Sequence, residues 1–129
     1  MDPHASQMIA VEAVITLSDP AGRDGLVARS APIQQATRDD EPGCLVYCFA
    51  ADPCHADRIQ VYELWADQAS LQAHFDHPNY HAMRAMLNGA GLASAISRKL
   101  RIDAVAPVYG PGRVASAAFH DLPDSPIPG

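Results

Sequence analysis

The 129-residue chain is poor in basic residues and has a single lysine, Lys99. Lysine and arginine together number 9 against 15 acidic residues, which gives a formal net charge of -6. This balance, with no basic cluster, argues against nucleic acid or an anionic membrane as a partner. No apolar run approaches the ~20 residues of a membrane helix, and the start of the chain does not resemble a signal peptide. We therefore expect a soluble, cytoplasmic protein.

Familiar metal and nucleotide motifs are also missing. The cysteines, Cys44, Cys48 and Cys54, form no C-x-x-C pair, and no H-E-x-x-H sequence is present. Their odd number, without a secretory signal, indicates free thiols in a reducing compartment. No glycine-rich phosphate loop precedes a helix, which excludes P-loop and Rossmann nucleotide sites. The length predicts one domain with a modest core.

Strand and helix signals alternate along residues 1–105. β-branched and apolar composition indicates strands, whereas capping residues and apolar spacing indicate helices. The predicted strands cover 8–17, 44–51, 58–65 and 93–103, and the predicted helices cover 20–37 and 67–88, the second interrupted at Pro78. The β-α-β-β-α-β order is that of a ferredoxin-like α+β fold, a split β-α-β antiparallel sheet with the helices on one face.

Such a sheet leaves one face without helices. Both alternating sets of side chains in 44–51 lack charge, so association should bury the uncovered face. We expect a homodimer whose sheet faces pack together. Residues 106–129 form a Pro/Gly-rich C-terminal extension, which we expect to pack on the domain or the partner subunit. Its apolar residues are Val108, Tyr109, Phe119, Leu122 and Ile127.

Histidines are concentrated in one stretch that contains His74, His77 and His81. Pro78 interrupts the helix between them, so surface or capping roles are favoured over a metal site for His77 and His81. His74 falls on the apolar side of its helix, one turn after Leu71. It is either a buried core histidine or a titratable group that faces a cavity.

Glu63 is a carboxylate in an otherwise apolar pattern, because it shares a strand face with Ile59, Val61 and Trp65. It lies at the sheet rim, pairs across the dimer, or acts as a general base with a raised pKa. A salt bridge to an arginine such as Arg58, Arg98 or Arg101 is favoured over the catalytic role. Trp65 is either a core residue or the flat wall of a pocket for an aromatic ligand.

Four short motifs follow one another along the chain. They are Glu41-Pro42-Gly43-Cys44, Tyr62-Glu63-Leu64-Trp65, Ala73-His74-Phe75 and His77-Pro78-Asn79-Tyr80. Together they resemble the antibiotic biosynthesis monooxygenase (ABM) domain family over about residues 8–103. The resemblance implies a ferredoxin-like fold that forms a dimeric α+β barrel through its sheets, which agrees with the pattern above.

The same resemblance implies a cofactor-independent monooxygenase that oxidises a small aromatic quinol or phenol with O₂, without flavin, haem or metal. Such an enzyme must supply a base, an aromatic cage and a dry cavity. The resemblance implies His74 as the base or anion-stabilising donor and Glu63 as an orienting residue. The implied substrate-binding residues are Trp65, Tyr47, Phe75, Tyr62 and Tyr80.

Some features leave other functions open. Haem-degrading relatives use an asparagine on the first strand. Residues 8–17 contain none, which argues against that activity here. The family also includes isomerases and other members, and a fold does not fix a function. The alternatives are a non-redox enzyme of the dimeric α+β barrel type and a ligand-binding or sensing domain without turnover. In the last case, His74 and Trp65 are only core residues.

Overall fold

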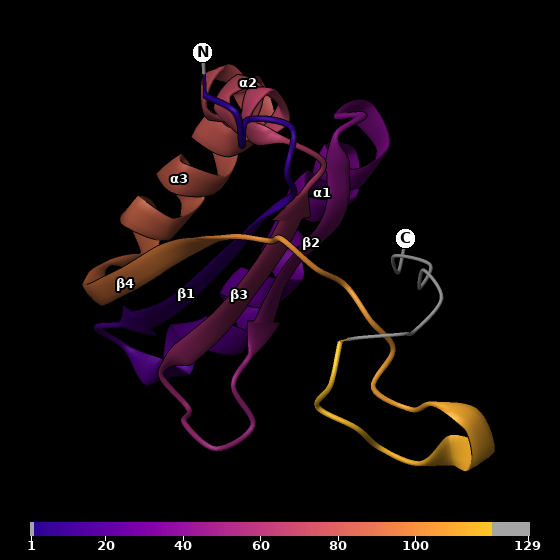
Figure 1. Ribbon diagram of the computed structural model, residues 1–129. Helices are drawn as coiled ribbons and strands as arrows, with labels where there is room; N and C mark the ends of the chain where they lie inside the picture. Colours follow the sequence, from indigo (N-terminus) through magenta and orange to yellow (C-terminus); the bar gives the residue numbers. More distant parts are fainter. Residues whose placement is uncertain (1, 120–129) are drawn as a thin grey trace.

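The computed structural model describes residues 2–119 (Figure 1). Its main elements, in chain order, are β1 (Ile9–Leu17), α1 (Arg23–Asp40), β2 (Cys44–Ala51), β3 (Arg58–Trp65), α2 (Gln68–Asp76), α3 (Pro78–Ala90) and β4 (Leu92–Arg101). The predicted β-α-β-β-α-β order is confirmed, and the second helical segment is divided at Pro78 as predicted. Proline suits the first position of a helix, because its missing N–H would have no partner there.

The four strands form one sheet in the order β2-β3-β1-β4, and every neighbouring pair is antiparallel. This topology confirms the ferredoxin-like α+β fold. The buried core contains side chains from the first three strands and all three α-helices. Its largest fully buried members include Trp65, Tyr47, Leu26 and Ile59. Burial of this apolar surface is the main favourable contribution to folding.

Helix α1 lies three residues farther along the chain than predicted, because Pro20–Gly22 form a separate 3-10 turn. The α-helix itself starts at Arg23, continues past Pro32 and ends at Asp40 rather than near Thr37. The residue after it, Glu41, precedes Pro42 and has an extended backbone, with φ -108° and ψ 101°. A proline disfavours helical geometry in the residue before it, so Pro42 accounts for the end of α1.

The face of the sheet that points away from the helices (Figure 1) carries exposed apolar side chains. Tyr62 is 43% exposed, Ile96 is 73% exposed and Leu100 is 37% exposed. On the same face, Arg98 Nη2 pairs with Glu12 Oε1 at 3.0 Å. These are the side chains that the expected homodimer would bury, and the dimer itself stays a prediction.

Beyond β4 the chain runs away from the sheet and helices (Figure 1). A small hairpin forms around the turn Pro111–Arg113, with a β-bridge between Tyr109 and Ala115. The exposed large apolar side chains between β4 and residue 119 are Val105, Val108, Tyr109, Val114 and Phe119. Packing of residues 106–129 on a partner subunit stays a prediction, and Leu122 and Ile127 lie outside the described residues.

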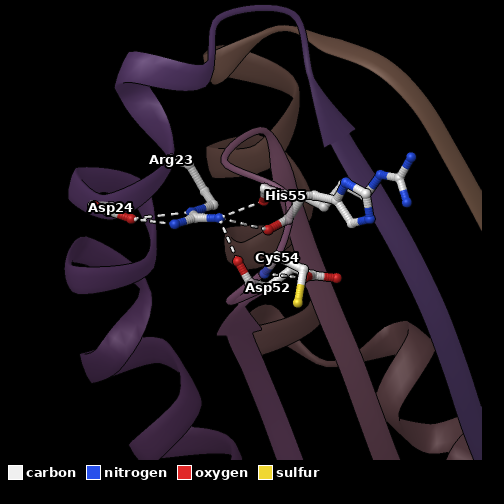
Figure 2. Close-up of polar contacts among 6 residues, drawn as sticks. Arg23, Asp24, Asp52, Cys54 and His55 are labelled. Carbon is white, nitrogen blue, oxygen red and sulfur yellow. Dashed lines mark hydrogen bonds and ion pairs between the residues drawn. The ribbon is translucent and has the colours of Figure 1, made fainter.

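Arg23 fixes the loop between β2 and β3 to the start of α1 (Figure 2). Its Nη1 donates to the carbonyl oxygens of Asp52 at 2.9 Å and His55 at 2.7 Å. Its Nη2 pairs with Asp24 at 2.9 Å, and the arginine side chain is only 12% exposed. One guanidinium therefore satisfies acceptors that are far apart in the sequence.

We expect Arg23→Ala to lower the free energy of unfolding by about 1–3 kcal/mol, because hydrogen bonds from a charged donor are lost. Urea denaturation followed by Trp65 fluorescence measures this change. Arg29→Ala is the matched control, since Arg29 is an exposed arginine on the same helix. Equal stability of the two variants would show that Arg23 does not anchor the loop.

Candidate functional site

A cavity of about 480 Å³ lies between the helices and the helix-facing side of the sheet. Ligand pockets typically have volumes of ~300–1,000 Å³, so this cavity can hold a small molecule. Its walls are mostly apolar, with a few polar and charged groups. The predicted site residues that line it are Tyr47, Glu63, His74, Phe75 and Tyr80.

Two predicted substrate-binding residues lie elsewhere. Trp65 is completely buried and does not line this cavity. It packs against the His74 ring, with 4.5 Å between ring centroids, and so helps to hold the imidazole in place. Tyr62 is adjacent to Glu63 on β3 and therefore points to the opposite face of the sheet. It belongs to the exposed apolar face rather than to the cavity.

His74 is only 1% exposed and is held by a second buried side chain, Glu41. His74 Nδ1 lies 2.8 Å from Glu41 Oε1, and Asn79 Nδ2 donates to Glu41 Oε2 at 3.2 Å. Since a carboxylate only accepts hydrogen bonds, this contact places the proton of a neutral His74 on Nδ1. The lone pair is then on Nε2, and the residue borders the cavity.

Sequence analysis assigned no role to Glu41, although the residue lies in one of the quoted motifs. It follows the last residue of α1, where the negative end of the helix dipole disfavours a carboxylate. A carboxylate at this unfavourable position is the sequence feature that could have indicated a role for Glu41. The adjoining turn passes close to α2, because a Cβ atom at Gly43 would overlap the side chain of Ser70. Glycine therefore allows the end of α1 to approach the helix that carries His74.

Glu63 is a second buried acid, with 7% of its surface exposed. Burial, together with the charge of Glu41, raises its pKa to about 7 against the opposing effect of a hydrogen bond from Trp65. That bond joins Trp65 Nε1 to Glu63 Oε1 at 3.0 Å. Of the ion pairs among residues 2–119, none includes Glu63. Near neutral pH this carboxyl can therefore take up or release a proton.

The surroundings of His74 favour its neutral form. Burial lowers the pKa of His74 and His77 lowers it further, whereas the hydrogen bond and charge of Glu41 act in the opposite direction. Aromatic rings enclose the imidazole, with centroid distances of 5.4 Å to Tyr80 and 5.5 Å to Tyr47. Burial also raises the pKa of Tyr47, so its hydroxyl stays protonated. A neutral imidazole in this environment can accept a proton from a bound ligand.

The remaining histidines of the stretch have other positions. His77 caps α3, because its Nδ1 accepts a hydrogen bond from the Asn79 backbone N–H at 3.0 Å, as predicted for a capping residue. His81 is exposed beside Tyr80. Within residues 2–119, no group of three or more His, Cys, Asp or Glu side chains is arranged to hold a metal ion. In the same range, no helix combines the length and apolar character needed to cross a bilayer.

Comparison with solved structures finds the same fold in proteins from bacteria. A candidate antibiotic biosynthesis monooxygenase from Caulobacter crescentus superposes with a TM-score of 0.69 at 22% identity, covering 76% of this chain and 92% of that one. A similarly described protein from Chloroflexus aurantiacus has a TM-score of 0.59 at 26% identity, covering 83% of this chain and 99% of that one. At 22% identity, the likeness to the Caulobacter structure concerns the fold alone.

Sequence comparison gives one curated relative and one family model that match this chain. An uncharacterized protein from Synechocystis is 31% identical over 62 residues, which is 48% of this chain and 42% of that protein. The match thus spans less than half the length of the Synechocystis relative. The family model described as antibiotic biosynthesis monooxygenase matches residues 8–86, which include all four motifs and every predicted site residue. The chain therefore belongs to the antibiotic biosynthesis monooxygenase family.

Proposed function

We propose that the protein is a cofactor-independent monooxygenase that oxidises a small aromatic quinol or phenol with O₂. The observation that carries this proposal is the state of His74. Its ring borders an apolar cavity while Glu41 occupies Nδ1, which leaves Nε2 as a base. Membership of the family supports the class of reaction.

In the proposed reaction, Tyr47, Phe75 and Tyr80 bind the aromatic ring, and His74 Nε2 removes a phenolic proton. The electron-rich anion then reacts with O₂ and forms a bond between a ring carbon and oxygen. Cleavage of the O–O bond leaves one oxygen atom in the product as a carbonyl and releases the other as water. The substrate supplies all the electrons, so the reaction requires no external reductant.

Two acids assist this proton transfer. Glu41 stabilises the imidazolium that forms when His74 takes the proton, as a carboxylate does beside a histidine base. Glu63, which has a pKa of about 7, can donate a hydrogen bond from its protonated form to a substrate oxygen. The apolar walls exclude water and so strengthen both interactions.

We further propose that the working form is a cytoplasmic homodimer joined through the exposed sheet face. The exposed side chains of Tyr62, Ile96 and Leu100 support this arrangement, because apolar patches of this kind mark sites of association. In this proposal, the extension 106–129 packs on the partner subunit and covers its own exposed apolar residues.

The rise in activity at the acidic end of the pH profile should follow the deprotonation of His74. Its lowered pKa predicts that kcat/KM rises with pH through a range below the ordinary ~6.5 of histidine, as the base loses its proton. Activity should then fall as pH passes about 7, because Glu63 ionises and can no longer donate. Glu63→Gln should keep the acid limb and lose the alkaline one. An unchanged alkaline limb in that variant would remove Glu63 from the mechanism.

Oxygen uptake by metal-chelated protein tests the proposed function. An oxygen electrode would follow the reaction with a panel of dihydroxynaphthalenes and anthrones, after treatment with EDTA. The proposal predicts substrate-dependent uptake that chelation does not change. Absence of uptake with every substrate would contradict the proposal and favour a non-redox enzyme or a sensing domain.

A further inference from the structure

Two positively charged side chains border the same cavity as His74. They are Arg84 on α3 and Lys99 on β4, and both are exposed. Neither takes part in an ion pair within residues 2–119. The chain has 15 acidic residues against 9 basic ones, so two cations without acidic partners at one cavity are unexpected.

The sheet register places Lys99 in line with Glu63. Lys99 pairs with Val11 across β1 and β4, and Val11 pairs with Glu63 across β1 and β3. These residues form one row on the helix-facing side of the sheet. Neighbouring strands are ~4.8 Å apart, so the backbone of Lys99 lies about 10 Å from that of Glu63. The lysine stem can cover the apolar wall while its ammonium group remains at the cavity mouth.

Helix α3 carries Arg84 one turn beyond a residue that contacts His74. Tyr80 contacts the His74 ring and lines the cavity, and Arg84 follows it by four residues on the same helix face. At 1.5 Å per residue, this spacing moves Arg84 about 6 Å farther along α3. The lining therefore combines two groups that can transfer a proton, His74 and Glu63, with two cations, Arg84 and Lys99.

The other charged residues of the lining do not form ion pairs with Arg84 or Lys99. Glu63 is the only acidic residue among the lining residues, and it forms no ion pair with either cation. Arg98 is also among the lining residues, but its guanidinium lies on the opposite face of the sheet, where it is paired with Glu12. A neutral ligand would leave Arg84 and Lys99 without a counterion.

We propose that Arg84 and Lys99 bind a carboxylate of the substrate, which makes the substrate class hydroxylated fused-ring aromatic acids. This inference rests on the proposed function and specifies the substrate of the same site. The carboxylate lies between the two cations, while the phenolic hydroxyl at the far side of the ring system reaches His74 Nε2. The arginine fork suits a carboxylate, because it can donate two parallel hydrogen bonds.

Binding of two stable compounds tests the proposal without turnover. 6-Hydroxy-2-naphthoic acid carries a hydroxyl and a carboxylate at opposite ends of a bicyclic ring, and 2-naphthol lacks the carboxylate. Isothermal titration calorimetry at neutral pH and low salt should show that the acid binds about tenfold more tightly, from two partly exposed charge pairs. The preference should decrease as salt is added.

Variants that remove one positive charge show whether Arg84 and Lys99 cause the preference for the acid. Arg84→Gln and Lys99→Gln should each raise the Kd of the acid by up to about fivefold and leave the Kd of 2-naphthol unchanged. Arg29→Gln removes the same charge from α1, outside the cavity lining, and should change neither value. Thermal unfolding of each variant verifies that the fold is retained.

The outcomes separate this inference from the proposed function. A charge-dependent preference for the acid without any oxygen uptake would support the carboxylate site and contradict the monooxygenase. Equal binding of the two compounds, an equal loss of both in the variants, or no binding of the acid would overturn the carboxylate site. None of these last results would depend on whether the protein consumes O₂.

Discussion

His74→Ala is expected to lower kcat for oxygen uptake by about 10²–10⁴-fold, the usual contribution of a general base. The substrate would still enter the cavity, but no group at the correct position would take its proton. His74→Gln should have a similar effect, although its amide can still donate a hydrogen bond to Glu41. Oxygen uptake at several pH values measures both variants, and added imidazole should partly restore activity to His74→Ala.

This experiment separates a base from a core histidine. A core role predicts that His74→Ala lowers only the thermal stability, because removing a buried ring leaves a cavity and an unpaired Glu41. His74→Gln keeps most of the volume and the hydrogen bond, so its stability should remain closer to that of the original protein. Full activity in a folded His74→Gln variant would exclude His74 as the base.

Glu41→Gln is expected to lower kcat about 100-fold while the fold is retained, because Glu41 positions the base. A glutamine amide can donate to His74 Nδ1, which would place the proton of a neutral imidazole on Nε2 and block the base. Loss of the carboxylate should also lower the pKa of His74, because Glu41 now raises it. The acid limb of the pH profile should therefore move to lower pH.

NMR of the imidazole nitrogens measures the tautomer directly. The account predicts that the proton lies on Nδ1 in the original protein and on Nε2 in a large fraction of Glu41→Gln. Asp39→Asn is a matched control, since Asp39 is an exposed acid near the same end of α1. An unchanged tautomer and pH profile in Glu41→Gln would leave Glu41 with a purely structural role.

The strands and helices could be predicted closely because their signals are local. The predicted bounds 44–51 and 58–65 match β2 and β3, since alternation and β-branched residues lie within each segment. Asp67 caps α2 by accepting a hydrogen bond from the Ser70 backbone N–H at 2.8 Å. Pro78 starts α3, as a residue without an N–H can. The end of α1 was predicted too early, because the apolar spacing stops before the helix does.

The site could be predicted only in part, because a strand pattern gives the face of a residue and not its neighbours. Glu63 and Trp65 share one strand face as predicted, yet only Glu63 lines the cavity. The position of Tyr62 could have been read from alternation, since adjacent strand residues face opposite sides. Glu41 was missed because its partner, His74, lies 33 residues away in the sequence.

Isotope labelling with ¹⁸O₂ shows most directly whether the protein is a cofactor-independent monooxygenase. Metal-chelated protein would oxidise a dihydroxynaphthalene under ¹⁸O₂ in unlabelled water, and mass spectrometry would locate the label before the product exchanges with solvent. The account predicts one ¹⁸O atom in the product and one in water, with incorporation strongly reduced in His74→Gln. Product without ¹⁸O, or incorporation that EDTA abolishes, would contradict a cofactor-independent monooxygenase.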